Sequence, residues 1–310
     1  MTHLSVIAFP GAPNLPLFAA QAHGFCADAG LDIDFQTTPS SVFQFEQFGT
    51  GAIDIAFTAF DNVVAYREGQ GAAKLPSLPD FRAVMGCTQI ELSLVVAPDI
   101  KTIGDLRGRS LALDAVSTGF AFVLYEMLAR SGLAPGDYEV VPVGATPERW
   151  RSVKEGAHAG TITIEPFTSI ARAAGFPTLL KSGDFFSAYQ GGVIAARHHW
   201  MIENEAALAA FLRVYLRGLG WVLDPANREA AAAILAERMP EIQPKALDAV
   251  MRSLLSERSG LTPDGAILRE GARTVLDLRS KYGAGGAVLT DVDRYLDLGW
   301  RERALAQAGP

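Results

Sequence analysis

Two acidic side chains occupy matching positions in the two halves of the chain, each where a short apolar run ends. Asp61 follows the run 53–57, and Glu165 follows the run 161–164. A carboxylate at such a place can accept hydrogen bonds from an amine, an amide or a ring N–H of a small molecule. The structural alternative is that Asp61 caps a helix opening at Asn62 and that Glu165 only faces solvent.

Hydroxyl and glycine residues that suit helix starts form a second candidate group. Exposed N–H groups at a helix start attract anions, but the same residue types are also ordinary N-caps, and the pattern leaves both interpretations open. The residues are Ser40 and Ser41 before a helix that ends near residue 48, and Ser117, Thr118 and Gly119 before a helix over 120–130.

Aromatic residues gather on the predicted loops, and together they indicate a pocket that could stack a planar or apolar ligand. These loops contain no Arg or Lys, so we expect no bidentate clamp for an anion. The pattern favours a neutral or cationic solute, heteroaromatic or amine-bearing. The aromatic residues are Phe9, Phe43, Phe60, Phe120, Phe167 and Tyr189.

The cysteines and histidines of the chain do not suggest a catalytic site or a metal site. The two cysteines, Cys26 and Cys87, and the five histidines show no metal-ligand spacing. Neither cysteine stands beside a candidate base, so both are expected to be buried structural thiols, although bridged and free forms stay open. We predict no catalytic residue, no metal site and no cofactor.

Composition excludes several classes of protein. The chain has 310 residues, of which 49% are hydrophobic and 20% charged, with a formal net charge of −7. Such apolar content argues against disorder, and the absence of a basic cluster argues against nucleic-acid binding. No uninterrupted apolar run reaches the length of a membrane span. The first residues are expected to form a strand and not a secretion signal, so either the protein is cytoplasmic or a leader has been removed.

Hydrophobic patterning predicts an α/β protein with alternating strands and helices, followed by a helical tail. The expected strands are 4–9, 31–35, 53–57, 81–85, 92–97, 110–113, 138–143, 161–164 and 193–196. Between them we expect helices at 15–23, 41–48, 63–68, 120–130, 147–155 and 166–174. The tail should contain helices at 203–223, 227–238, 244–255, 263–281 and 291–308.

An internal repeat indicates two similar lobes. The order helix, Gly, strand, helix, Gly, strand, acidic residue occurs twice, about 105 residues apart, with Gly51 and Gly156 in the same place. Alternation of this kind favours mostly parallel sheets that are covered on both faces. Ligands of such sheets lie beyond the carboxyl ends of the strands, so we expect the strand-exit loops to face an interlobe cleft.

Several segments, in this order and spacing, resemble the periplasmic solute-binding proteins of ABC importers. The resemblance is to the NMT1/THI5-like subgroup, which includes binders of nitrate, sulfonates, taurine and thiamine precursors. It covers most of residues 4–217 and is carried by 16–25, 30–34, 49–57, 103–110, with its Leu-Arg-Gly-Arg entry to the second lobe, and the Thr-Ile-Glu-Pro-Phe segment 163–167.

The resemblance implies a two-lobed type II periplasmic-binding-protein fold. Lobe 1 would comprise residues 1–88 and 193–310, lobe 2 residues 93–188, and the hinge residues 89–92 and 189–192. It further implies a periplasmic, monomeric protein that encloses a small molecule between its lobes and then docks on an ABC permease of an inner membrane; if Met1 is the native start, a cytoplasmic location follows instead.

The ligand-binding residues that these considerations predict all lie on strand-exit loops or hinge segments. Two other functions remain open on the same scaffold: an enzyme similar to thiamine-pyrimidine synthases, desulfinases or decarboxylases, and a cytoplasmic ligand sensor. The predicted residues are Pro10, Gly11, Asn14, Ser40, Ser41, Phe43, Phe60, Asp61, Gln89, Ser117, Thr118, Gly119, Glu165 and Tyr189.

Overall fold

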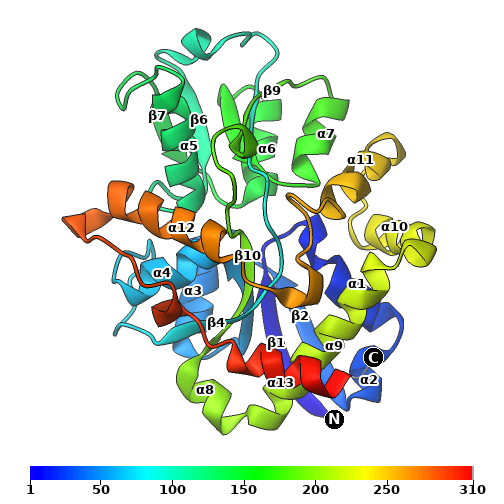
Figure 1. Cartoon of the computed structure of the whole chain (residues 1–310). Helices are drawn as coiled ribbons and strands as arrows, with labels where there is room; N and C mark the ends of the chain where they lie inside the picture. Colours follow the sequence, from blue (N-terminus) through cyan, green and yellow to red (C-terminus); the bar gives the residue numbers. More distant parts are fainter. Residues whose placement is uncertain (309–310) are drawn as a thin grey trace.

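The computed structural model describes residues 1–308 and consists of two lobes, one above the other in Figure 1. Each lobe is built on a five-stranded sheet. Lobe 1 contains β1 (Thr2–Ala8), β2 (Leu31–Thr37), β3 (Ile55–Ala59), β4 (Phe81–Gly86) and β10 (Gly192–Arg197), in the spatial order β2-β1-β3-β10-β4. Lobe 2 contains β5 (Ser93–Val96), β6 (Ser110–Leu113), β7 (Glu139–Pro142), β8 (Gly160–Thr163) and β9 (Thr178–Lys181), in the order β7-β6-β8-β5-β9.

Both sheets are mostly parallel, which confirms the expected fold class, and each contains one antiparallel strand. In lobe 1 β10 runs against β3 and β4, and in lobe 2 β5 runs against β8 and β9. These are the two strands that the chain enters directly after crossing between the lobes. They start at the edge of the sheet where the other strands end, so the carboxyl ends of those other strands all point toward the partner lobe.

The helices of the two β/α units lie near their predicted positions, apart from the short helix over Phe25–Asp28, which was not predicted. They are α1 (Leu15–Ala22), α2 (Phe25–Asp28), α3 (Ser41–Thr50) and α4 (Phe60–Arg67) in lobe 1, and α5 (Gly119–Arg130), α6 (Thr146–Lys154) and α7 (Phe167–Ala173) in lobe 2. Gly51 and Gly156, the predicted breaks after α3 and α6, adopt φ values of +88° and +79°. Only glycine adopts this backbone region without strain, which explains why both helices end there.

The tail is helical as expected, but its boundaries differ. Its helices are α8 (His198–Glu203), α9 (Glu205–Leu223), α10 (Arg228–Arg238), α11 (Pro244–Leu254), α12 (Arg269–Tyr282) and α13 (Gly299–Ala308). The expected helix over 263–281 begins only at Arg269, because Asp264 and Gly265 have φ values of +53° and +60°, which interrupt a right-handed helix.

Helix α9 is long and apolar enough to cross a membrane by length and composition alone, but 61% of its apolar window is buried in the protein. It packs against α1 and α13 over one face of the lobe 1 sheet. Its apolar residues therefore form part of the core, and a core helix meets the same length criterion as a membrane span.

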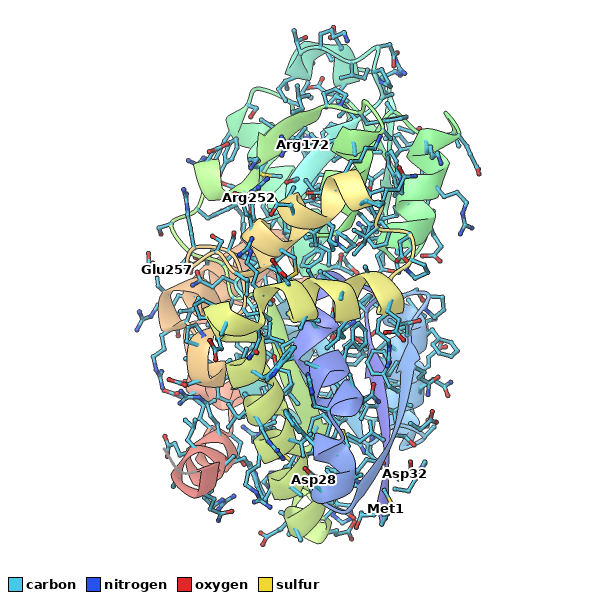
Figure 2. The ribbon with its side chains drawn as sticks, turned by 90° about the vertical axis from the view of Figure 1, so that its right-hand side faces the viewer. Met1, Asp28, Asp32, Arg172, Arg252 and Glu257 are labelled. Atoms are coloured by element: carbon cyan, nitrogen blue, oxygen red, sulfur yellow. The ribbon has the colours of Figure 1, made fainter. Side chains whose placement is uncertain are left out.

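Two tail helices bridge the lobes. Helix α12 packs against α4 of lobe 1 and α5 of lobe 2, and Figure 1 shows it lying across the junction. Helix α11 lies at the same level on another side, where Figure 2 shows its Arg252 below Arg172 of α7. The Nζ of Lys245 donates to the carbonyl oxygen of Ala173 in α7 at 2.8 Å. The tail therefore braces the two lobes against each other.

Candidate functional site

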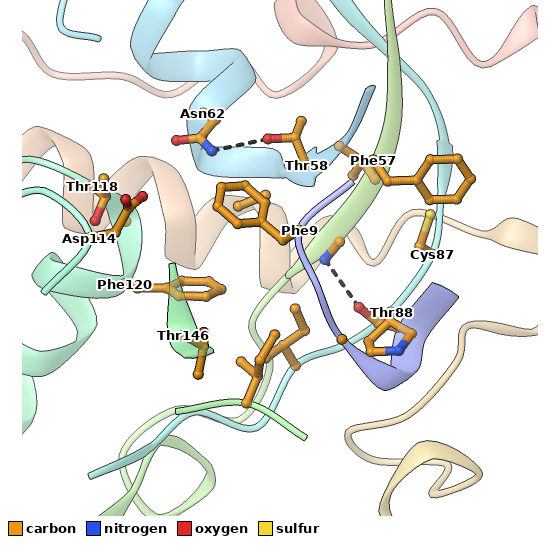
Figure 3. Close-up of a pocket in the computed structure, with 18 of the residues that line it drawn as sticks. Phe9, Phe57, Thr58, Asn62, Cys87, Thr88, Asp114, Thr118, Phe120 and Thr146 are labelled. Atoms are coloured by element: carbon orange, nitrogen blue, oxygen red, sulfur yellow. Dashed lines mark hydrogen bonds between the residues drawn. The ribbon is translucent and has the colours of Figure 1, made fainter. Parts of the chain in front are cut away.

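A cavity lies between the lobes, where the strands of both sheets end (Figure 3). Its volume is about 80 Å³ measured to the centres of water molecules. One buried water needs about 10–15 Å³ on this measure, so the cavity has room for a molecule of several heavy atoms. It is lined by Phe9, Gly11, Pro13, Asn14, Phe57, Thr58, Ala59, Asn62, Cys87, Thr88, Ile90, Asp114, Thr118, Gly119, Phe120, Thr146, Arg149, Ile164, Gly192 and Val193.

The lobe 1 wall combines an aromatic surface with two fixed amides. Asn14 donates from Nδ2 to the carbonyl oxygen of Phe9 at 2.9 Å, and Asn62 donates from Nδ2 to Thr58 Oγ1 at 3.0 Å. Both asparagines are buried, and within residues 1–308 neither side-chain oxygen accepts a hydrogen bond from the protein. This wall therefore presents apolar rings together with amide groups whose orientation is already set.

The lobe 2 wall contains the start of α5, a helix of 12 residues. Thr118 is its N-cap, and its Oγ1 accepts from the N–H of Ala121 at 3.4 Å. The N–H groups of Gly119 and Phe120 make no hydrogen bond within the described chain. Of the two interpretations for this motif, the cap is confirmed, and the two residues with unpaired N–H groups belong to the lining of the cavity.

An arginine that sequence reasoning overlooked also lines this wall. Arg149 lies on α6, is only 2% exposed, and donates from Nη2 to Thr146 Oγ1 at 2.8 Å. Its Nε and Nη1 have no hydrogen-bond partner. Burial lowers its pKa to about 10, a shift that Asp114 and Glu148 oppose, so the guanidinium is charged at neutral pH.

The prediction that the cleft has no bidentate clamp for an anion rested on the composition of the loops alone. It considered only the strand-exit loops, whereas Arg149 comes from the helix that follows one of them. The available signal was helical spacing, because Arg149 stands three residues after Thr146 and therefore on the same helix face.

The two lobes are closed over the cavity by hydrogen bonds that cross the cleft. They are Ala145 N to Pro39 O at 2.8 Å, Ala12 N to Glu165 O at 3.4 Å, Ser41 N to the two Asp114 carboxylate oxygens at 3.0 and 3.2 Å, and Arg279 Nη2 to Ser117 O at 3.0 Å.

The two acidic residues singled out at strand exits serve other partners in this closed form. Asp61 lies inside the first turn of α4, whose N-cap is Ala59, so the expectation that Asp61 caps a helix at Asn62 is wrong. Its carboxylate is paired with Arg279. Glu165 accepts from Ser169 Oγ at 2.9 Å and from Ser169 N at 3.2 Å, and burial raises its pKa. Neither carboxylate lines the cavity.

The other predicted site residues fall into two groups. Gly11, Asn14, Thr118 and Gly119 line the cavity. The rest do not line it: Pro10 is half-buried in the loop after β1, Ser40 caps α3 through Phe43 N, Ser41 N donates to Asp114, Phe43 is exposed, Phe60 is buried in the core, Gln89 donates to Glu257 O at 3.2 Å, Ser117 accepts from Arg279, and Tyr189 is buried with no partner for its hydroxyl.

Cys87 is a cavity residue that had been assigned a purely structural role. Both cysteines are free and buried, as expected for structural thiols. Burial raises the pKa of Cys87 to about 12, although the neighbouring Tyr215 hydroxyl acts to lower it. Among residues 1–308 no group of three or more His, Cys, Asp or Glu side chains is placed to hold a metal ion.

Comparison with known proteins gives consistent matches. The family described as NMT1/THI5 like matches residues 13–228. A formylaminopyrimidine-binding protein of Halalkalibacterium halodurans is 24% identical over 242 residues, which span 75% of this chain and 69% of the relative.

Solved structures share the fold over nearly the whole chain. The periplasmic nitrate-binding protein of Synechocystis PCC 6803 is 16% identical with a TM-score of 0.80, covering 99% of this chain and 89% of that one. The ligand-binding component of an ABC-type import system of Staphylococcus aureus is 13% identical with a TM-score of 0.78, covering 98% and 99%. A desulfurization enzyme also has this fold, at 14% identity and a TM-score of 0.66, covering 98% and 99%.

Proposed function

The chain belongs to the NMT1/THI5-like family, and from this premise we propose that it is the solute-binding component of an ABC-type importer. The observation that carries the proposal is the cavity between the lobes, closed by hydrogen bonds across the cleft. The lobes would be residues 1–88 with 193–310 and residues 93–188, and segments 89–92 and 189–192 would be the hinge. Opening and closing about this hinge would admit and enclose the solute.

The ligand we propose is a small, flat molecule. Figure 3 shows the ring of Phe9 from lobe 1 above the ring of Phe120 from lobe 2, with Phe57 to the right near Cys87. Aromatic rings favour planar partners that stack on their faces. Gly11, Asn14, Thr118 and Gly119 would contact the ligand directly. The formylaminopyrimidine-binding relative supports a heteroaromatic ring as the flat body.

Docking on a permease would use both lobes in their closed arrangement. Phe43 of lobe 1 is 36% exposed and Val116 of lobe 2 is 44% exposed. Each stands two residues from the contact between Ser41 and Asp114, so exposed apolar side chains flank the closed junction. Such a surface exists only when the lobes are together, which would make docking depend on closure. We propose accordingly that the protein acts in the periplasm, as a monomer that meets an inner-membrane permease.

An enzyme on the same fold is the alternative, and the chemistry of the cavity favours the binder. A nucleophilic cysteine needs a pKa lowered by a nearby base or positive charge. Cys87 is the one thiol in the cavity wall among the described residues, and its pKa of about 12 leaves it protonated at neutral pH.

Thermal unfolding in the presence of small solutes tests the proposed function. A library should include purines, pyrimidines, amino acids, aromatic acids and their amides. A bound compound raises the free energy of unfolding by RT ln(1 + [L]/Kd), about 2.7 kcal/mol when its concentration is one hundred times Kd. The melting temperature rises as a result. The variant Phe120→Ala should lose most of the shift, whereas Phe176→Ala, which changes another half-buried ring outside the cavity, should keep it. Turnover of a stabilising compound, or no stabilisation by any compound, would contradict the proposal.

A further inference from the structure

We propose that Arg149 and the first turn of α5 form a subsite for an oxyanion, so that the ligand carries a carboxylate or sulfonate on its flat body. The inference rests on the proposed function and specifies the class of solute. It differs from the neutral or cationic ligand that the loop composition favours, and it follows from a residue outside those loops.

The first argument is the state of the Arg149 side chain. A buried charge is costly unless it is paired and hydrogen-bonded. Arg149 is 2% exposed, yet within residues 1–308 it forms no ion pair and makes a single side-chain hydrogen bond, to Thr146. Its Nε and Nη1 are unpartnered. Native structures rarely leave such donors unsatisfied without a functional reason.

The second argument is that Asp114, the acidic residue with the largest effect on the pKa of Arg149, already accepts hydrogen bonds from another residue. Asp114 lines the same cavity, and both of its oxygens accept from Ser41 N across the cleft. Asp114 opposes the fall in the pKa of Arg149 but does not pair with it. The carboxylate therefore favours the charged guanidinium without accepting a hydrogen bond from it.

The third argument comes from α5. The unpaired N–H groups of Gly119 and Phe120 stand at the positive end of a helix of 12 residues, which favours negative charge. Figure 3 shows Thr118, Phe120 and Thr146 together on one side of the cavity. Residues of the lobe 2 wall thus carry two independent sets of donors, while the lobe 1 wall supplies rings and amides. The geometry orients the ligand, with its anionic group toward lobe 2.

Titration calorimetry with matched acids and amides tests this subsite. The probes are benzoate, benzenesulfonate and nicotinate, with benzamide and nicotinamide as neutral counterparts, together with the acid and amide forms of any compound that stabilises the protein. An acid should bind about ten to a hundred times more tightly than its amide, since charge-assisted hydrogen bonds to buried donors are the stronger ones. Comparison of benzoate with benzenesulfonate distinguishes the two oxyanion classes.

Variants separate recognition of the anion from folding. Arg149→Gln should lose the preference for the acid while binding the amide within about threefold of the wild type. Arg149→Lys should retain part of the preference, because lysine keeps the positive charge but lacks the planar pair of N–H donors of a guanidinium. Arg151→Gln, an exposed change on the same helix, should alter neither affinity. Circular dichroism and the affinity for the amide verify that each variant is folded.

The experiments distinguish a failure of the oxyanion subsite from a failure of the proposed solute-binding function. If amides or amines bind as tightly as acids, and Arg149→Gln leaves the affinity for acids unchanged, the oxyanion subsite is overturned and the solute-binding function stands. If no compound of any class binds, the proposed function fails and the subsite fails with it.

Discussion

Asp61 and Arg279 form a bidentate ion pair between α4 and α12, with Nε–Oδ1 at 2.7 Å and Nη2–Oδ2 at 2.6 Å. Both side chains are almost completely buried. The same guanidinium donates to the carbonyl oxygen of Ser117 in lobe 2 and to Gln70 Oε1 at 3.1 Å, and it lies 4.8 Å from the centre of the Phe122 ring. One arginine of the tail therefore joins both lobes.

Removing this arginine should destabilise the protein strongly. Arg279→Met leaves the Asp61 carboxylate buried and unpaired, which costs about 3–5 kcal/mol in proteins. Urea unfolding followed by tryptophan fluorescence measures the loss. Arg269→Met on the same helix breaks an exposed pair with Asp293 and should cost less than about 1 kcal/mol.

A double variant identifies the cause. Asp61→Leu with Arg279→Met removes both charges, so it should recover a large part of the stability lost in Arg279→Met. A double variant that is as unstable as the sum of the two single changes would show that lost packing, and not an unpaired charge, dominates.

The second prediction concerns Glu165, whose pKa is raised by burial against the hydrogen bonds from Ser169. A folded state with a raised pKa holds its proton more tightly than the unfolded chain. The resulting stability is fully present below the ordinary value of 4.5 and is lost as the pH rises from there through the raised pKa. Glu165→Gln has no such proton, so the stability of the wild type relative to this variant should fall as the pH rises above about 4.5.

The same variant tests the role of Glu165 at the site. The glutamine side chain of Glu165→Gln would keep an oxygen that can accept from Ser169, and the carboxylate it replaces does not line the cavity. Calorimetry should therefore find the affinity for a stabilising solute within about twofold of the wild type. A large loss of affinity would return Glu165 to direct contact with the ligand, as its position in the sequence first suggested.

Local patterns predicted much of the fold. The two β/α units, the glycine breaks at Gly51 and Gly156 and the helical tail all rest on short-range signals, because periodicity and turn chemistry act over a few residues. The antiparallel β5 and β10 were beyond this reasoning, since a strand looks the same in sequence whichever way it runs. Strand β9 was missed because its four residues are all half-buried and show no alternation.

The site was less predictable, for a physical reason. Four of the residues predicted from strand-exit loops lie in the cavity wall: Gly11, Asn14, Thr118 and Gly119. The partners of the buried charges lie far away along the chain, however, and Asp61 meets Arg279 across 218 positions. Without that pairing, an acidic residue at a strand exit looks available to a ligand.

The third prediction concerns the reactivity of the thiols. With its pKa raised to about 12, Cys87 has a thiolate fraction on the order of one in ten thousand at pH 8. Cys26 is also buried, and burial raises its pKa. Iodoacetamide at pH 8 should therefore label neither cysteine in the native protein and both in urea, as mass spectrometry would record. Rapid native labelling of Cys87 would instead support a catalytic role for it.

The fourth prediction uses Gly119, which lies directly against lobe 1. A Cβ atom at this position would be 2.5 Å from Cβ and Cγ of Asp61 and 2.8 Å from the hydroxyl of Tyr189. Asp61 is held by Arg279 and cannot retreat without breaking a buried ion pair. The methyl group of Gly119→Ala should therefore oppose closure of the lobes while leaving each lobe folded, because its backbone is ordinary helix and alanine is favoured there.

Small-angle scattering and calorimetry test this prediction together. Gly119→Ala should give a larger radius of gyration than the wild type and bind a stabilising solute at least about tenfold more weakly, since affinity falls with the fraction of closed protein. Gly220→Ala is the matched control, because a Cβ in this part of α9 meets no atom within 4 Å. It should raise the stability by about 0.5–1 kcal/mol and leave closure and affinity unchanged. Equal scattering and affinity for both variants would mean that contact between Asp61 and Gly119 does not limit closure.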